Sequence, residues 1–203
     1  MSFQWIIDNC ETMSIDTQPV VAQTETRDGT VRATSRGGSV WRFTVKLPDG
    51  PSWQEYRKDI ARAQALDRYT TANVQINTAG QSWLVGYQGN ITNIATVSAS
   101  WTQGSTTVTL TGGQAGSGYN FRAGDIIQLG SAGKVYRVNA DVAYNSNTVT
   151  VHRPVLDATG SGTLRIGPNC VFTVICKEFP QWSLFARDQV GWGGAFVFQE
   201  SLT

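Results

Sequence analysis

The segment FRAGDIIQLGSAGKVYRV, residues 121–138, combines three glycines with Asp125 and Lys134, a composition shared by phosphate-binding loops and plain turns. A phosphate-binding loop leads from a strand into a helix whose N-terminal amides meet the anion. Here both flanks have strand-like sequence, and Val rather than Ser or Thr follows Lys134. The segment therefore predicts a β-hairpin in which Asp125 accepts hydrogen bonds from backbone amides of its own turn.

The other residue types able to do chemistry lack partners at useful spacing. His152 is the single histidine, and no second histidine or cysteine stands near it at metal-ligand spacing. Cys170 and Cys176 share one face of an expected strand, where extended chain holds them about 20 Å apart, too far for a disulfide. We expect both to act as small core residues, and we expect no metal or cofactor.

A pair of carboxylates could serve glycoside hydrolysis. Asp125, Asp141 and Asp157 are the acids of residues 91–167, and Glu178 stands alone before Phe179. Two such groups must flank a scissile bond, and the sequence places them together only if a fold is assumed. No nucleophile elbow or dinucleotide-binding motif is present. We therefore predict that the chain is not an enzyme.

Aromatic residues of the middle segment form a candidate binding set. Trp101, Tyr119, Phe121 and Tyr144 are expected to be exposed, where they could contact a sugar, stacked bases or another protein. As a ligand, a sugar is favoured over nucleic acid, because residues 91–167 hold only five basic and three acidic residues. A place in the core or in a protein interface is the alternative for each of them.

The N-terminal third shows period-two alternation followed by a helical pattern. In VWRFTVKLP, residues 40–48, large apolar residues alternate with polar ones, as in a strand with one buried face. With turns at Asp28-Gly29 and Gly37-Gly38, residues 18–47 predict a three-stranded meander. The segment from about 52 to 68 predicts one α-helix, which Ser52 caps.

The remainder predicts strands. NVQINT and SWLVGYQG, residues 73–78 and 82–89, are expected to pair. Between residues 91 and 167 short strands alternate with Gly, Asn and Ser clusters, a pattern typical of a small barrel or sandwich. The apolar run CVFTVIC predicts a strand buried on both faces. We therefore expect a mainly β chain with a β-barrel or sandwich domain, residues 1–90 plus 168–203, interrupted by a small barrel, residues 91–167.

Composition and charge exclude several classes of partner. Sixteen basic residues face fifteen acidic ones, with no run of either sign, so a nucleic-acid-binding surface is not expected. No apolar run reaches the length of a membrane span. Three cysteines and an N-terminus without signal-peptide features suggest synthesis in a reducing cytoplasm. The low charged fraction, 15%, is compatible with surface covered in an assembly.

The order of these elements resembles the distal tail proteins of long-tailed bacteriophages, in particular the two-domain type with an inserted oligonucleotide/oligosaccharide-binding-like (OB-like) barrel. The resemblance rests on the helix after a β-meander and on four motifs, AGDIIQL, KVYRV, TVTVHRP and FQESL. It covers most of the chain, and its motifs are structural rather than catalytic.

The resemblance implies a structural virion protein in the phage tail. Six copies would form a ring that joins the tail tube to the tip or baseplate, with a lumen for DNA passage. The implied partners are the tail tube protein, the tape-measure protein and the hub or tip protein, without membrane insertion or sequence-specific nucleic-acid binding. The alternative from the residues is a carbohydrate-binding module or minor cell-wall hydrolase of a phage tail.

Overall fold

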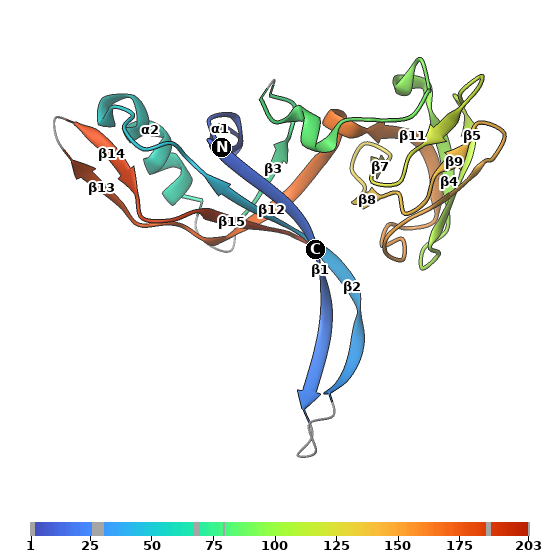
Figure 1. Cartoon of the computed structure of the whole chain (residues 1–203), viewed down its shortest axis with the longest axis horizontal. Helices are drawn as coiled ribbons and strands as arrows, with labels where there is room; N and C mark the ends of the chain where they lie inside the picture. Colours follow the sequence, from blue (N-terminus) through green and yellow to red (C-terminus); the bar gives the residue numbers. More distant parts are fainter. Residues whose placement is uncertain (1–2, 26–30, 67–69, 79, 186–187, 203) are drawn as a thin grey trace. The chain divides into compact units, whose positions relative to one another are not determined.

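The computed structural model describes residues 3–25, 31–66, 70–78, 80–185 and 188–202, with the backbone alone for 19–25 and 31–37 (Figure 1). The described chain is mainly β, as the sequence predicts, with helices α1 (Gln4–Asp8) and α2 (Trp53–Gln64). The strands are β1 (Thr12–Glu25), β2 (Val31–Lys46), β3 (Thr71–Gln75), β4 (Ser98–Trp101), β5 (Thr107–Gly112), β6 (Tyr119–Phe121), β7 (Ile126–Leu129), β8 (Val135–Arg137), β9 (Val142–Ala143), β10 (Thr148–Thr150), β11 (Gly160–Ile166), β12 (Val171–Glu178), β13 (Trp182–Phe185), β14 (Gln189–Trp192) and β15 (Phe196–Glu200). Three 3-10 helices are η1 (Ser82–Val85), η2 (Ile94–Thr96) and η3 (Gly167–Asn169).

The chain divides into two compact units. Unit 1 comprises residues 1–72 and 174–203, and unit 2 comprises residues 73–173. Unit 2 begins before the expected segment 91–167, because the Tyr87 hydroxyl donates to the Asn120 carbonyl at 2.6 Å and its ring meets Phe121 edge-on. At the ends of unit 2, the Thr173 hydroxyl donates to Asn73 Oδ1 at 3.0 Å. An OB-like topology for this unit stays a prediction.

A five-stranded sheet has the strand order β1-β2-β15-β12-β3. The alternation in VWRFTVKLP is confirmed, since Trp41, Phe43 and Val45 are buried on one face of β2. The meander prediction is wrong, because β2 runs unbroken through Gly37-Gly38. The ladder shifts register there, and Gly38 has a φ of 94°, so the glycines form a β-bulge instead of a turn. The expected Asp28-Gly29 turn lies outside the described residues.

Helix α2 forms as its sequence indicates. The Ser52 hydroxyl accepts a hydrogen bond from the Gln54 amide at 3.2 Å, and Ile60 and Ala63 are buried on the apolar face. The helix ends at Gln64, before the expected residue 68. Helix α1 was not predicted, since five residues are too few to show a helical period.

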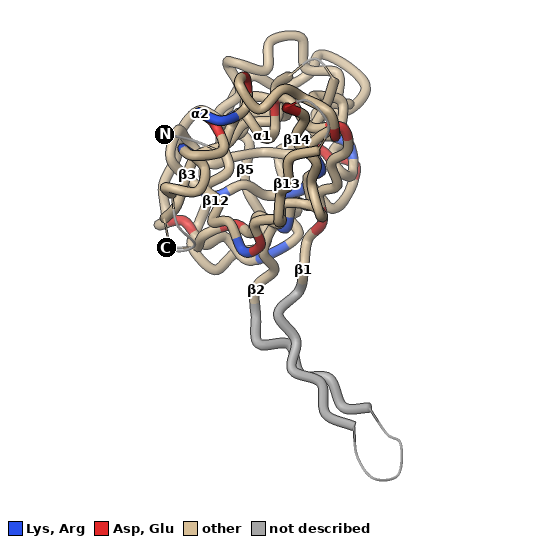
Figure 2. The backbone as a smooth tube through the Cα atoms, turned by 90° about the vertical axis from the view of Figure 1, so that its left-hand side faces the viewer, with Lys and Arg blue, Asp and Glu red and all other residues tan. Residues whose placement is uncertain are grey.

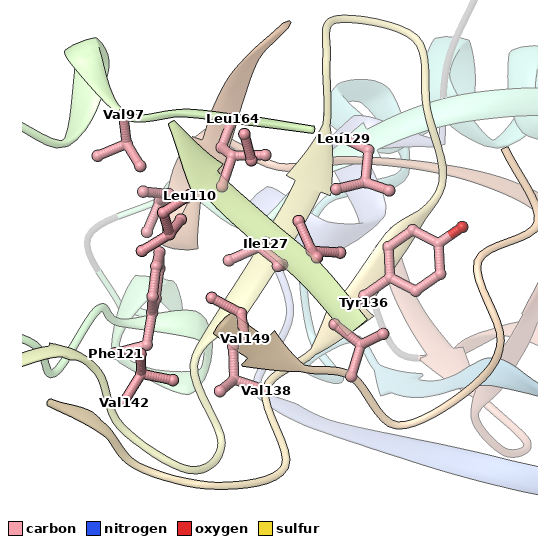
Figure 3. Packing of buried hydrophobic residues seen from close by; sticks show 14 of the residues in the cluster. Val97, Leu110, Phe121, Ile127, Leu129, Tyr136, Val138, Val142, Val149 and Leu164 are labelled. Carbon is pink, nitrogen blue, oxygen red and sulfur yellow. The ribbon is translucent and has the colours of Figure 1, made fainter. Parts of the chain in front are cut away.

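Unit 2 is built on a six-stranded antiparallel sheet with the order β10-β5-β4-β11-β7-β8, beside the pair β6–β9. Inward side chains from these strands form one hydrophobic core, part of which is drawn in Figure 3. Its labelled members include Ile127, Leu129, Val149 and Leu164. Alternation of apolar and hydroxyl residues in TVTL and TVT explains how β5 and β10 each bury a single face.

Polar side chains buried in unit 2 are bonded to its backbone. Asn120 is fully buried, and its Oδ1 accepts from the Ala115 amide at 2.7 Å. The Asn120 Nδ2 donates to three carbonyls, those of Ala143, Tyr144 and Ser146, at 3.1, 3.2 and 2.9 Å. One side chain thus bonds to four backbone groups, and the Ala143 carbonyl also accepts from the Ser146 amide at 2.9 Å.

Two strand predictions are corrected. SWLVGYQG was expected as a strand, yet Ser82–Val85 forms η1, whose side chains do not follow the period of two. CVFTVIC was expected to be buried on both faces, yet β12 buries alternate residues, Phe172, Val174 and Cys176, and leaves Val171, Thr173 and Ile175 half-buried. Cys170 and Cys176 are buried and are not joined in a disulfide, as expected.

Candidate functional site

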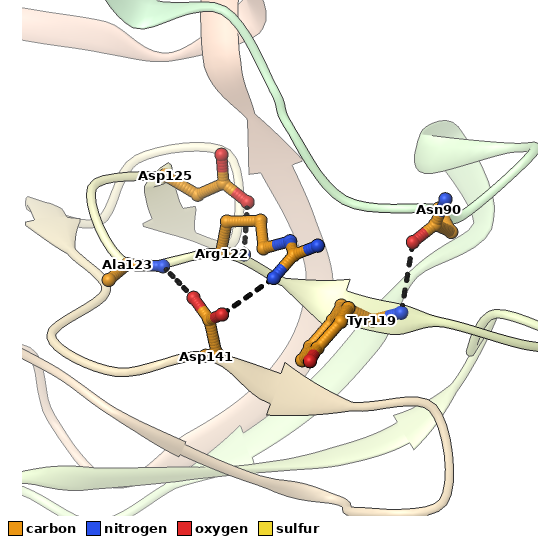
Figure 4. A network of polar contacts seen from close by, with 6 residues as sticks. All are labelled: Asn90, Tyr119, Arg122, Ala123, Asp125 and Asp141. Atoms are coloured by element: carbon orange, nitrogen blue, oxygen red, sulfur yellow. Dashed lines mark hydrogen bonds and ion pairs between the residues drawn. The ribbon is translucent and has the colours of Figure 1, made fainter.

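The segment 121–138 is the hairpin that its flanks predict. Strand β7 pairs with β8 through Ile127 opposite Tyr136. Asp125 is buried just before β7, where its Oδ2 accepts from the Arg122 amide at 2.8 Å (Figure 4). Its Oδ1 accepts from the Gln88 amide at 2.9 Å. Burial raises the pKa of Asp125, while the two amide bonds act in the opposite direction. The prediction that Asp125 caps its own turn is confirmed.

An exposed ion pair adjoins this turn. Arg122 Nη1 donates to Asp141 Oδ2 at 2.7 Å, and the Ala123 amide donates to Asp141 Oδ1 at 2.8 Å (Figure 4). The Ala123 amide and the guanidinium lower the pKa of Asp141. The Arg122 guanidinium also lies 3.6 Å from the centroid of the Tyr119 ring. Its charge is therefore directed to groups of the same chain.

The third acid of this region holds another turn. Asp157 accepts two hydrogen bonds from the Lys134 amide, at 3.0 and 3.1 Å, and one from the Tyr136 hydroxyl at 2.7 Å. Each of the three acids, Asp125, Asp141 and Asp157, therefore accepts a hydrogen bond from at least one backbone amide. Among the described residues, no three His, Cys, Asp or Glu side chains are grouped to hold a metal ion.

His152 occupies a structural position. Its Nδ1 accepts from the Arg137 amide at 3.0 Å, and its ring lies edge-on to Tyr136 with 6.3 Å between centroids. Burial, followed by the charges of Arg153 and Arg137, lowers the pKa of His152 to about 3. The imidazole is therefore neutral near pH 7 and serves as a hydrogen-bond acceptor.

The four candidate aromatic residues do not form one exposed set. Exposure was predicted wrongly for Phe121, which is fully buried in the core of unit 2. Tyr144 is 46% exposed, and Tyr119 lies on the paired strand β6 beneath the Arg122 guanidinium. Trp101 is half-buried, and its Nε1 donates to the Ala158 carbonyl at 2.9 Å. Ligand contact by Trp101, Tyr119 and Tyr144 stays a prediction.

Sequence reasoning did not identify a surface of aligned hydroxyls on unit 2. Thr148 of β10, Thr109 of β5, Ser100 of β4 and Ser161 of β11 stand opposite one another across four strands. Thr150 pairs with Thr107 in the next row. The residues between them, such as Val108 and Val149, are buried. We call this surface the hydroxyl face. It consists of Thr107, Thr109, Thr148, Thr150, Ser100 and Ser161.

A hollow of about 410 Å³ lies over part of this surface. Its lining includes Ser100, Thr107, Thr109 and Ser161 of the hydroxyl face, together with Trp101. The repeated sequence TVT at 107–109 and 148–150 was the available signal, but pairing of the two segments could not be known without the fold.

Unit 1 carries exposed apolar side chains at the hairpin of β13 and β14. Leu184 is 50% exposed and Phe185 is 45% exposed. Among the described strands, β13 pairs only with β14. The hairpin is held to α2 by a stack of Trp182 on Trp53, with ring centroids 4.7 Å apart.

No protein-family model matches the chain, and no curated protein matches its sequence. Within the described part of the chain, no helix is both long and apolar enough to cross a bilayer.

Proposed function

We propose that the chain is a structural subunit that assembles into a ring, the distal tail adaptor of a long-tailed phage. The observation that carries this proposal is the length of the β1–β2 ladder. Strand β15 pairs with β2 from Val45 to Arg42, whereas β1 follows β2 as far as Glu25 opposite Val31. Beyond Trp41 the two described strands therefore pair only with each other.

A two-stranded ladder of this length is at best marginally stable alone in water. Its free edges also offer backbone amides and carbonyls to another strand. Contact with a neighbouring subunit would supply both a third strand and a covering surface. The exposed Leu184 and Phe185 add apolar area to the same unit, which supports a protein partner for unit 1.

A head-to-tail contact between identical chains closes into a ring when its rotation fits. Six copies, a lumen for DNA, and the tail tube, tape-measure and hub or tip proteins as partners follow from the phage-tail resemblance and are part of the proposal. Basic and acidic residues are interspersed along the chain (Figure 2), a distribution compatible with DNA transit through weak contacts. The virion tail is the proposed location.

Analytical ultracentrifugation of the full chain over a hundredfold concentration range tests the assembly. We expect a concentration-dependent oligomer, and rings in negative-stain images of the largest species. The same measurement with added tail tube protein tests capture at one ring face. A chain that remains monomeric at every concentration, with and without the tube protein, would overturn the proposal.

A further inference from the structure

We infer that the hydroxyl face of unit 2, together with the hollow beside Trp101, binds a neutral oligosaccharide. This inference goes beyond assembly, since it concerns unit 2 and requires no second copy of the chain. It rests on the alignment, the chemistry and the rigidity of the side chains on this surface.

The alignment matches an extended ligand. Thr148, Thr109, Ser100 and Ser161 lie on consecutive strands, so their hydroxyls repeat about every 4.8 Å across the sheet. A second row is formed by Thr150 and Thr107. Each lies two residues from its neighbour in the first row, Thr148 or Thr109, which is about 6.7 Å along an extended strand. A chain of sugar rings laid across these strands meets a protein hydroxyl at every step.

The chemistry favours an uncharged partner. All six side chains of the hydroxyl face are Ser or Thr, so none carries a charge to balance a phosphate, a carboxylate or an ammonium group. A hydroxyl donates one hydrogen bond and accepts others, which is also the capacity of each sugar hydroxyl. Nucleic acid fits poorly, because its phosphates would meet no Lys or Arg on this surface.

The side chains are held ready for contact. Thr107, Thr109, Thr148 and Thr150 are β-branched and therefore stiff about χ1, and each sits on a paired strand. Their immobilisation on binding costs little conformational entropy.

Trp101 borders the hollow, but its indole lies on the other face of the sheet. Trp101 stands opposite Val108 of β5 and Gly160 of β11, and its ring packs against the core of unit 2. The six side chains of the hydroxyl face therefore meet a ligand through hydroxyl groups, which favours a polar, neutral partner.

Saturation-transfer difference NMR tests the inference on the full chain and tolerates a large assembly. The probes are maltotriose and chitotriose, with trigalacturonate as the charged comparison. We expect at least one neutral trisaccharide to give a signal with millimolar affinity. We expect that signal to weaken about tenfold in Thr107→Val/Thr109→Val, since two hydrogen bonds of about 0.7 kcal/mol each give that factor.

Val has nearly the shape of Thr and favours strands, so the double variant is expected to fold, as circular dichroism checks. Thr111→Val, on the same strand outside the two rows, is the matched control and should keep the full signal. The inference is overturned if neither neutral sugar binds, if the double variant binds as well as the wild type, or if trigalacturonate alone binds.

Discussion

Unit 2 bonds buried polar side chains to its own backbone, whereas unit 1 exposes apolar side chains on β13 and carries a stretch of the β1–β2 ladder that pairs with no third described strand. Asn120 and Asp125 illustrate the first case, with six backbone hydrogen bonds between them at 2.7–3.2 Å. Leu184 and Phe185 illustrate the second.

This difference separates two sources of stability. Buried side chains that bond to the backbone of their own unit, as Asn120 and Asp125 do, contribute to stability without a partner. A unit with an exposed strand edge and exposed apolar residues gains stability when a partner covers them. We therefore expect substitutions in unit 2 to change folding and substitutions on the exposed surface of unit 1 to change association.

The largest effect is expected for Asn120→Ala. The substitution removes four hydrogen bonds, one from the Ala115 amide and three to carbonyls, of which that of Ala143 keeps its bond from the Ser146 amide. It should lower the free energy of unfolding by about 3 kcal/mol. Urea denaturation followed by circular dichroism measures it. Asn139→Ala is the matched control, because exposed Asn139 makes one long bond to Val151, and equal losses would contradict the comparison.

Asp125→Asn should destabilise unit 2 by about 2 kcal/mol, because one carboxylate oxygen becomes an NH2 group that faces a backbone amide donor. Asp141→Asn, on an exposed carboxylate, should cost less. The same urea titrations compare the two variants. A larger loss of unfolding free energy in Asp141→Asn than in Asp125→Asn would contradict this expectation.

His152 provides a pH test within unit 2. Its pKa is lowered from 6.5 to about 3 in the folded chain, so the unfolded chain binds the proton first and stability falls as pH drops through this range. His152→Asn keeps an acceptor for the Arg137 amide but does not titrate. Because the ring is only partly buried, solvent screening reduces the effect.

Melting temperatures at pH 7 and pH 4 measure this effect. The decrease in melting temperature from pH 7 to pH 4 should be smaller in His152→Asn than in the wild type by roughly 3 °C. This is the shift that about 1 kcal/mol produces in a chain of this size. Carboxylates titrate in both proteins, so the difference between them isolates His152. An identical drop in both proteins would refute the role of His152.

The smallest effect on folding is expected for Leu184→Ser/Phe185→Ser. Both side chains are exposed, so the free energy of unfolding of the monomer should change by no more than about 0.5 kcal/mol. Self-association should weaken at least about tenfold, as sedimentation measures. Leu202→Ser, an exposed leucine outside the hairpin, is the control, and equal weakening by both changes would exclude a specific role for β13.

Periodic segments were the most predictable part of the fold. One face is buried in β5, β10, α2 and the part of β2 from Trp41 to Val45, and the apolar residues recur at the period that this burial requires. The Asp125 turn was predictable because Asp bonds to nearby backbone amides in any such turn. These features depend on interactions within a few residues.

The errors arose where local signals have two structural outcomes. Gly37-Gly38 suits a turn and a β-bulge equally, and only the partner strand distinguishes them. Phe121 was expected to be exposed with Tyr119, but the ladder of β6 and β9 shifts register between these two residues. The hydroxyl face could not be predicted, because it depends on the order of the strands in the sheet. Residue spacing does not specify that order.

The hydrogen bond between Thr173 and Asn73 places the two ends of unit 2 side by side. A segment that leaves and re-enters a fold at adjacent points can be deleted and its flanks joined by a short turn. Replacement by another domain is possible at the same two points. For this chain, recombination near codons 73 and 173 could exchange unit 2 for another domain.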